Sequence, residues 1–507
     1  MSSMITAQYI EEPLLEFAKG QCLEHPQDGL FLYGPVKIKG APEVVNVGVI
    51  GTQTGIRLLN TWLKKLTGRI PTDNPRVFHT AGWPGFEACF GARLETEPVA
   101  SIVLGDTAIK NAASISNRTE AVRKTVKLYE DKILEHLRTE ETRPDVWCVV
   151  VPEIVHRYGR PEVIGPKDAR KATLMSEKTA AEFLRGGALF PEIEEEAKTY
   201  LFARNFHHQL KAQLLHKEVV VQVVRETTLD PTLDLDNFGN PRRSLQEPAK
   251  VAWNFATTLY FKARGQPWQL AHVRPRVCYV GLVFKEDPSP AQRGDACCAA
   301  QMFLNSGNGV VFRGALGPWY SEQKHEFHLD RDAAANLVTQ VVNAYKGDHG
   351  FPPSELFIHG RQRFSDDEWA GFQSVVPKDT RLVAVRIRPS QDLRLFRPNV
   401  SVPVLRGTAV TISRKEGFLW TTGYIPRLRT YPGFETPKPI HIEIHRGNGD
   451  LATVMRDILA LTKINYNACD YSSGLPVTLK FANRVGEILT ASPRGMEAPP
   501  LPFRFYI

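Results

Sequence analysis

The sequence predicts an α/β protein built from two units. In the first half, buried β-branched strands alternate with amphipathic helices, a pattern typical of a doubly wound sheet with ligands at the carboxyl ends of its strands. In the second half, three consecutive strands precede a further alternation of helices and strands. The 507 residues, of which 42% are hydrophobic, suffice for two cores of ordinary size. We divide the chain into residues 1–271 and 272–507.

The elements of the first half follow from hydrophobic periodicity. The loop Gly51-Thr52-Gln53-Thr54-Gly55 lacks the Gly-Lys-Ser/Thr ending of a phosphate loop, so we interpret it as an ordinary turn between strand and helix. The charged stretch from Tyr158 to Glu195 is predicted to be an insertion with a solvated face. The predicted elements are a strand at Val44–Gly51, a helix at Thr54–Leu66, a helix at Ala121–Arg138 and a strand at Asp145–Pro152.

The stretch from Arg204 to Trp268 carries the strongest functional pattern. A predicted helix at Asn205–Leu215 places His207 and Lys211 one turn apart on the same side. The apolar run that follows is interrupted only by Gln222, and Lys262 lies in the last turn of a second predicted helix. Two lysines, an imidazole and an amide could bind a terminal phosphate. From spacing alone, four solvated or edge residues are the simpler interpretation.

A resemblance favours the phosphate site. The residues His207, Lys211, Gln222 and Lys262, with the flanking Arg225-Glu226-Thr227-Thr228-Leu229 and Gly265-Gln266-Pro267-Trp268, resemble the MID domain of Argonaute proteins. The resemblance implies a Rossmann-like domain whose pocket binds the 5′ phosphate of a guide strand. The His and the long gap before Lys262 depart from the family pattern.

The second half resembles the Argonaute PIWI domain. Three strands followed by alternating helices and strands is the order of a ribonuclease H-like fold, on which PIWI is built. The segments Asp457–Asn467, Leu475-Pro476-Val477 and Phe481-Ala482-Asn483 also look PIWI-like. The predicted strands are Val277–Phe284, Ala296–Leu304, Gly309–Phe312, Leu356–His359 and Leu382–Arg386, and the predicted helices are Arg331–Tyr345 and Asp366–Val375.

The metal ligands of an active PIWI domain have no counterparts at the matching positions. Two divalent cations need clustered anionic oxygens. The positions that match the family's carboxylates hold Val283, Arg361 and Asn483, so the resemblance implies a domain that does not cleave. The alternative is a guided nuclease with displaced carboxylates, for which the candidates are the pairs Glu286 and Asp287, or Asp366 and Asp367.

Basic residues of the second half are candidates for contacts with a nucleic-acid backbone. Arg361 could either pair with a nearby acid or contact the guide–target duplex in the space that the metal ions would otherwise occupy. For each of the other basic residues taken alone, an ordinary surface charge is the simpler interpretation. The further candidates are Arg274, Arg276, Arg363, Lys480 and Arg484.

The chain ends in the apolar and aromatic segment Pro502–Ile507. The resemblance implies that the carboxylate of Ile507 lies beside the guide phosphate, where a structural Mg²⁺ would bridge the two groups. The alternative is simple packing of Phe503 and Phe505, with a carboxylate that has no ligand.

Bulk properties set the cellular context. A net charge of +8 and a pI near 9.0 are compatible with a nucleic-acid partner without proving one. The seven cysteines are scattered without a Cys-x-x-Cys pair, which favours buried thiols in a reducing compartment. Neither a signal peptide nor a membrane span is recognisable, so we expect a soluble cytoplasmic protein.

Taken together, these patterns look like a short prokaryotic Argonaute with MID and PIWI domains alone. The resemblance implies an RNA guide, a single-stranded DNA target and a partner chain with an APAZ region. The partner is expected to carry a TIR domain that hydrolyses NAD in antiviral defence, with activated complexes assembling into higher oligomers; a sirtuin-like or nuclease partner is the alternative. A third hypothesis is an α/β scaffold that binds only protein.

Overall fold

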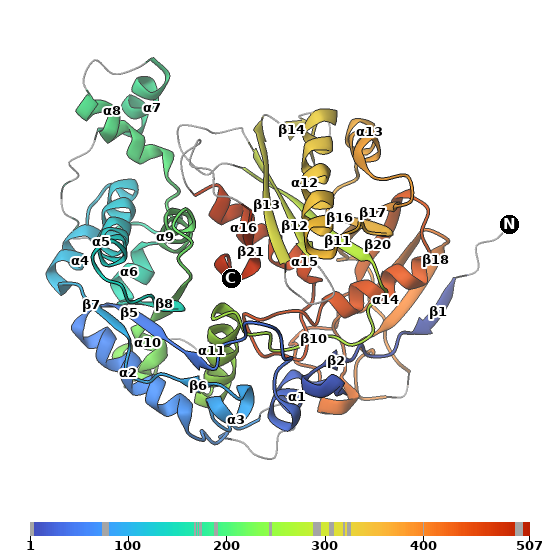
Figure 1. The fold of residues 1–507 in the computed structure, drawn as a ribbon, viewed down its shortest axis with the longest axis horizontal. Coiled ribbons are helices and arrows are strands. Elements are labelled where there is room, and N and C mark those ends of the chain that lie inside the picture. The colour runs from blue at the N-terminus through green and yellow to red at the C-terminus, as the bar shows by residue number, and fades with distance from the viewer. Residues whose placement is uncertain are drawn as a thin grey trace.

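The computed structural model describes residues 5–73, 81–166, 169, 171, 175–186, 191–242, 246–286, 296–303, 309–317, 320–321, 326–398, 400–491 and 500–507. Two separate sheets organise these residues (Figure 1). The chain end lies between the two halves, close to the helices that face the junction.

The first half contains a parallel sheet of four strands in the order β7-β5-β8-β9. Every residue of β5 and β8 is buried, as expected of central strands covered on both faces. One face packs in a core shared with α2 and α11, and the other in a core shared with α5 and α9. The bounds are β5 Val47–Gly51, β7 Ala100–Val103, β8 Val146–Val151, β9 Val221–Arg225, α2 Gln53–Thr67, α5 Arg118–Thr139, α9 Phe206–Leu215 and α11 Pro248–Lys262.

The Gly51–Gly55 turn is an ordinary helix start, as predicted. The hydroxyl of Thr52 accepts a hydrogen bond from the backbone N–H of Gly55 at 2.8 Å and caps α2. The same hydroxyl donates to the carboxylate of Glu226 at 2.6 Å, which ties α2 to the end of β9. The predicted insertion is described in part and contains the helices α7 (Glu177–Gly186) and α8 (Pro191–Lys198).

The second half contains a ten-stranded sheet in the order β1-β18-β19-β20-β17-β16-β11-β12-β13-β21. The antiparallel strands β11, β12 and β13 are followed by β16 and β17, which run parallel to β11. Helices α12 and α13 pack on one face, and α14, α15 and α16 on the other (Figure 1). The bounds are β11 Val277–Glu286, β12 Ala296–Phe303, β13 Gly309–Gly317, β16 Glu355–Gly360, β17 Arg381–Pro389, α12 Arg331–His349, α13 Asp366–Val375, α14 Leu451–Leu461, α15 Val477–Lys480 and α16 Ala482–Leu489.

The first strand belongs to the second sheet, although the predicted division assigns it to the first unit. Strand β1 (Thr6–Tyr9) pairs antiparallel with β18 (Thr408–Ser413). Next to it, the carboxylate of Glu12 accepts hydrogen bonds from Arg406 at 2.9 Å and from Lys463 at 2.8 Å. The division at residue 271 therefore separates residues that are joined by backbone pairing and by a buried ion-pair network.

The three strands β18, β19 (Glu416–Leu419) and β20 (Ile440–Gly447) were not predicted, although they complete the sheet. Strand β19 is short, whereas β20 alternates Ile440, Ile442 and Ile444 with polar residues, which is itself a strand signal. Pairing with one another and with β1 and β17 joins the three strands to the sheet. At the other edge, β21 (Leu501–Pro502) pairs with β13 and brings the chain end back to the sheet. Within the described ranges, no helix has the length and apolar character needed to cross a membrane.

Candidate functional site

A cavity of about 560 Å³ lies where α9, β9, α16 and the chain end meet. It collects three of the four predicted phosphate-binding residues and the predicted terminal carboxylate from segments almost 300 residues apart. Figure 1 shows the same convergence, with the C-terminus between α9 and α16. The lining residues are Arg160, His207, His208, Lys211, Gln222, Val223, Asn467, Arg484, Glu487, Ile488, Tyr506 and Ile507.

Lys211 is a buried basic residue on the wall of this cavity. Asn205 caps α9 by accepting from the N–H of His208, and the helix carries Lys211 into the interior, where it is 3% exposed. Its amine donates to the carbonyl of Tyr506 at 3.1 Å and to the terminal group of Ile507 at 2.5 Å. Burial, followed by the charges of Lys262 and Arg484, holds the pKa of Lys211 well below its ordinary value. An anion in the cavity would restore the charged form.

Lys262 lies behind Gln222 instead of on the cavity wall. The residue is 1% exposed, and its amine donates to the carbonyl of Val221 at 2.8 Å and to the side-chain oxygen of Gln222 at 2.6 Å. Lys262 is therefore the predicted phosphate-binding residue that does not line the cavity and contacts Gln222 instead. Lys262 orients the Gln222 amide, and burial lowers the pKa of Lys262 to about 7.

His207 supplies a neutral hydrogen-bonding group. Burial, and then the neighbouring charge of Lys211, keeps the pKa of His207 well below its ordinary value. The next residue, His208, lies 3.4 Å from the carboxylate of Glu487 on α16, which also accepts from Lys285 at 2.8 Å. These contacts fix α9 against α16 across the junction of the two halves.

Among the lining residues that the sequence did not single out are Arg160, Asn467 and Glu487. Arg160 follows α6 (Glu153–Tyr158) at the start of the predicted insertion, where a single basic residue carries no signal. Asn467 lies within the PIWI-like segment Asp457–Asn467, so the resemblance pointed to its neighbourhood without assigning it a role.

Two groups that line the cavity offer oxygen atoms among its basic side chains. The terminal carboxylate of Ile507 and the amide oxygen of Asn467 are oxygen donors of the kind that Mg²⁺ binds, and phosphate oxygens would complete the set. Of the two, the carboxylate also supplies negative charge to offset that of the cation.

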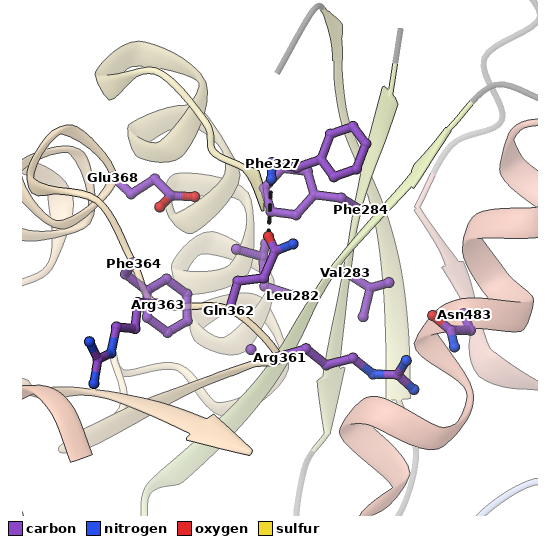
Figure 2. Close-up of a pocket in the computed structure, with 11 residues that line it drawn as sticks. Leu282, Val283, Phe284, Phe327, Arg361, Gln362, Arg363, Phe364, Glu368 and Asn483 are labelled. Atoms are coloured by element: carbon purple, nitrogen blue, oxygen red, sulfur yellow. Dashed lines mark hydrogen bonds between the residues drawn. The ribbon is translucent and has the colours of Figure 1, made fainter. Parts of the chain in front are cut away.

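A second cavity, of about 170 Å³, brings together Val283, Arg361 and Asn483. These residues come from β11, from the segment after β16, and from α16. Figure 2 shows the Arg361 side chain extending along the floor of the cavity toward Asn483, with Val283 above it. The three positions singled out as degenerate ligand positions therefore share one site.

The carboxylates near this second cavity are engaged elsewhere. Glu368 accepts from the backbone N–H groups of Leu329 at 3.0 Å and Ser365 at 2.7 Å, within the cap of α13. Asp366 pairs with Arg446. Of the proposed displaced ligands, Asp287 and the side chain of Glu286 lie outside the described residues. Among the residues that are described, no group of three or more His, Cys, Asp or Glu side chains is placed to hold a metal ion.

The other predicted backbone contacts divide into two groups. Arg274 forms ion pairs with Glu355 and Asp457, and Arg363 forms one with Glu443 at 3.0 Å. Arg276 donates to the carbonyl of Pro352 and lies over the ring of Phe351. These three arginines have intramolecular partners. Arg484 lines the first cavity, and Lys480 and Arg484 both lie near the ring of Phe481.

The sequence matches no protein-family model and no curated protein. The structure, however, is similar to solved Argonaute structures. One is Clostridium butyricum Argonaute bound to a guide DNA and a 19-mer target DNA, with a TM-score of 0.61 and 15% identity over 99% of this chain and 55% of that chain. The A. aeolicus Argonaute gives a TM-score of 0.54 and 15% identity over 97% of this chain and 54% of that chain. Aa-Ago with externally bound siRNA gives a TM-score of 0.53 and 15% identity over 99% of this chain and 56% of that chain.

The predicted fold class is confirmed: the chain has the α/β fold of the MID and PIWI domains of Argonaute. It spans about half the length of the Argonaute structures that it matches.

Proposed function

We propose that this chain is the guide-binding subunit of a nucleic-acid-guided prokaryotic immune complex. The observation that carries the proposal is the first cavity, where Lys211, His207, Gln222 and the Ile507 carboxylate converge. The amines of the buried residues Lys211 and Lys262 donate hydrogen bonds to carbonyl, amide and chain-end oxygens. A 5′ phosphate would supply an anion that stabilises the charged form of Lys211.

In the bound complex, each group of the pocket has a distinct role. Lys211 would bind the phosphate as a point charge, while His207 and the Gln222 amide donate hydrogen bonds that orient its oxygens. Lys262 would hold Gln222 in position from behind. A Mg²⁺ bound to the Ile507 carboxylate would neutralise part of the phosphate charge.

We further propose that the second half does not cleave. A valine side chain has no donor atom, and the guanidinium of Arg361 would repel a metal ion from the same cavity. The chain would then pair its guide with a complementary strand and leave that strand intact, so that base pairing reads the sequence while the protein reads the backbone.

The finer assignment rests on the resemblance to short Argonautes. On that basis the guide is RNA, the target is single-stranded DNA, and the complex acts in the cytoplasm. Target recognition would activate an APAZ partner with a TIR domain, in higher oligomers, to deplete NAD and kill or arrest the cell. Purifying the chain with its natural partner and measuring NAD consumption with matched and mismatched targets tests this; target-dependent deoxyribonuclease activity instead would favour a nuclease partner.

The pocket is tested with guides that carry a 5′ phosphate or a 5′ hydroxyl. We expect Lys211→Glu to weaken binding of the phosphorylated guide far more than that of the hydroxyl guide. Lys211→Met, which keeps the side-chain volume without a charge, should reduce the same preference. Lys217→Glu is the matched control, because Lys217 is exposed just beyond the end of α9. Equal losses of affinity for both guides would show that Lys211 is only part of a general basic surface.

The nuclease alternative is tested with a loaded guide, a matched target and Mg²⁺ or Mn²⁺. We expect no specific product. A product that disappears in Glu286→Ala or Asp287→Ala would establish cleavage by displaced carboxylates. The protein-only alternative predicts no salt-sensitive, phosphate-dependent affinity for short oligonucleotides.

A further inference from the structure

The second cavity contains a charge that is not balanced within the described part of the chain. Arg361 is exposed, and no described residue pairs with its guanidinium. Glu368, the carboxylate on the cavity wall, is 1% exposed and already accepts from two backbone N–H groups. Arg363, two residues further along, is neutralised by Glu443. The positive potential of the cavity therefore comes from Arg361.

The polar groups around Arg361 suit an anion with several oxygens. Asn483 projects from α16 toward the guanidinium (Figure 2), and its amide can donate to an oxygen that Arg361 also binds. The side-chain oxygen of Gln362 accepts from the N–H of Phe327 at 3.2 Å, so its amide nitrogen is the end that can donate to a ligand. A planar guanidinium and two amides match the tetrahedral oxygens of a phosphodiester.

Helix α16 connects this cavity to the pocket at the chain end. Asn483 lines the second cavity, while the next residue, Arg484, lines the first together with Glu487 and Ile488. Because an α-helix with its side chains is only about 10–12 Å across, the two cavities are separated by roughly the width of one helix. A nucleic acid anchored in the first cavity can therefore also reach the second.

We propose that the Arg361 cavity is a metal-independent binding site for one backbone phosphodiester of the bound guide–target duplex. The guanidinium supplies a fixed positive charge, and Asn483 orients the phosphate. The site strengthens duplex binding and fixes the position of the duplex against the second sheet. The nature of the ligand rests on the proposed function, whereas the existence of an anion site rests on the unbalanced charge.

The experiment measures binding of a 5′-phosphorylated guide–target duplex to the wild type, Arg361→Gln and Arg363→Gln. Arg363→Gln is the matched control because its guanidinium is already paired. In each protein, single phosphates of the duplex are replaced in turn by neutral methylphosphonates. Affinities are also measured over a range of KCl concentrations. Because Arg361 is exposed, the melting temperature of Arg361→Gln should equal that of the wild type.

We expect one linkage at which the neutral replacement weakens wild-type binding by about threefold to tenfold. In Arg361→Gln the same replacement should have no further effect on the affinity. The slope of the logarithm of the binding constant against the logarithm of the KCl concentration should become shallower by roughly 0.9, for the one lost phosphate contact. Arg363→Gln should behave like the wild type. Identical losses at every linkage in the wild type and Arg361→Gln would overturn the proposal. If the wild type bound guides with a 5′ phosphate and with a 5′ hydroxyl equally well, the proposed function would be refuted instead.

Discussion

The substitution Lys262→Met isolates the energetic cost of the buried lysine behind the phosphate pocket. Methionine is similar in volume and apolar, and it removes the amine that bonds Gln222 and Val221. Burial lowers the pKa of Lys262 from 10.5 to about 7. A pKa lowered this far means that the charged amine makes the folded protein about 5 kcal/mol less stable than the neutral amine does.

The direction in which stability changes with pH follows from proton binding. Between about pH 7 and pH 10.5, the unfolded chain holds a proton on this lysine that the folded chain has released, so the contribution of Lys262 to stability rises with pH. Between pH 7 and pH 9, this contribution grows by about 2 kcal/mol. The variant Lys262→Met lacks this pH-dependent contribution. The stability of the variant relative to the wild type should therefore be highest near pH 6 and should decline as the pH rises.

Thermal unfolding of the unliganded proteins measures the effect. For a chain of 507 residues, 1 kcal/mol shifts the melting temperature by about 1 °C, so the difference between variant and wild type should change by about 2 °C from pH 7 to pH 9. Lys217→Met, at an exposed position, is the control and should show no such change. A constant difference between Lys262→Met and the wild type across this range would show that Lys262 keeps its charge in the folded protein and refute the reasoning.

Three further predictions concern the same architecture. Glu12→Gln leaves Arg406 buried without its carboxylate and should cost about 3–5 kcal/mol. Burial raises the pKa of Glu12, but the charges and hydrogen bonds of Arg406 and Lys463 together lower it below its ordinary value, so the wild type should lose this advantage only in acid, below about pH 4.5; an equal loss at pH 7 and pH 3 would contradict the assignment. Gly281→Ala should lower the yield of folded protein, because the new Cβ would lie 1.8 Å from the carbonyl oxygen of Thr478; a melting temperature equal to that of the wild type would show that α15 can move away. Deletion of Ile507 should weaken binding of the phosphorylated guide more than binding of the hydroxyl guide, and it should reduce the effect of Mg²⁺ on guide binding. Guide-binding and Mg²⁺ titrations identical to those of the wild type would show that the chain end is not part of the site.

Much of the candidate site could be predicted because its residues lie on regular elements and their order resembles a known pocket, although their spacing alone favoured solvated residues. One helical turn separates His207 from Lys211, and a single amide interrupts the apolar strand at Gln222. The role of Lys262 could not be predicted, since α11 is buried almost all round and periodicity does not show which buried partner its last turn meets.

The sequence alone determined the two α/β units, most of their helices and strands, and the residues Val283, Arg361 and Asn483 at the positions that the resemblance compares with the family's carboxylates. These features depend on local patterning and on residue identity, which are both visible in one dimension. Tertiary structure alone decided that β1 joins the second sheet, that Lys262 lies behind Gln222, and that α16 separates two cavities. Such relations arise from the packing of segments hundreds of residues apart, where buried charges and backbone groups are satisfied by whichever partners the fold brings within hydrogen-bonding distance.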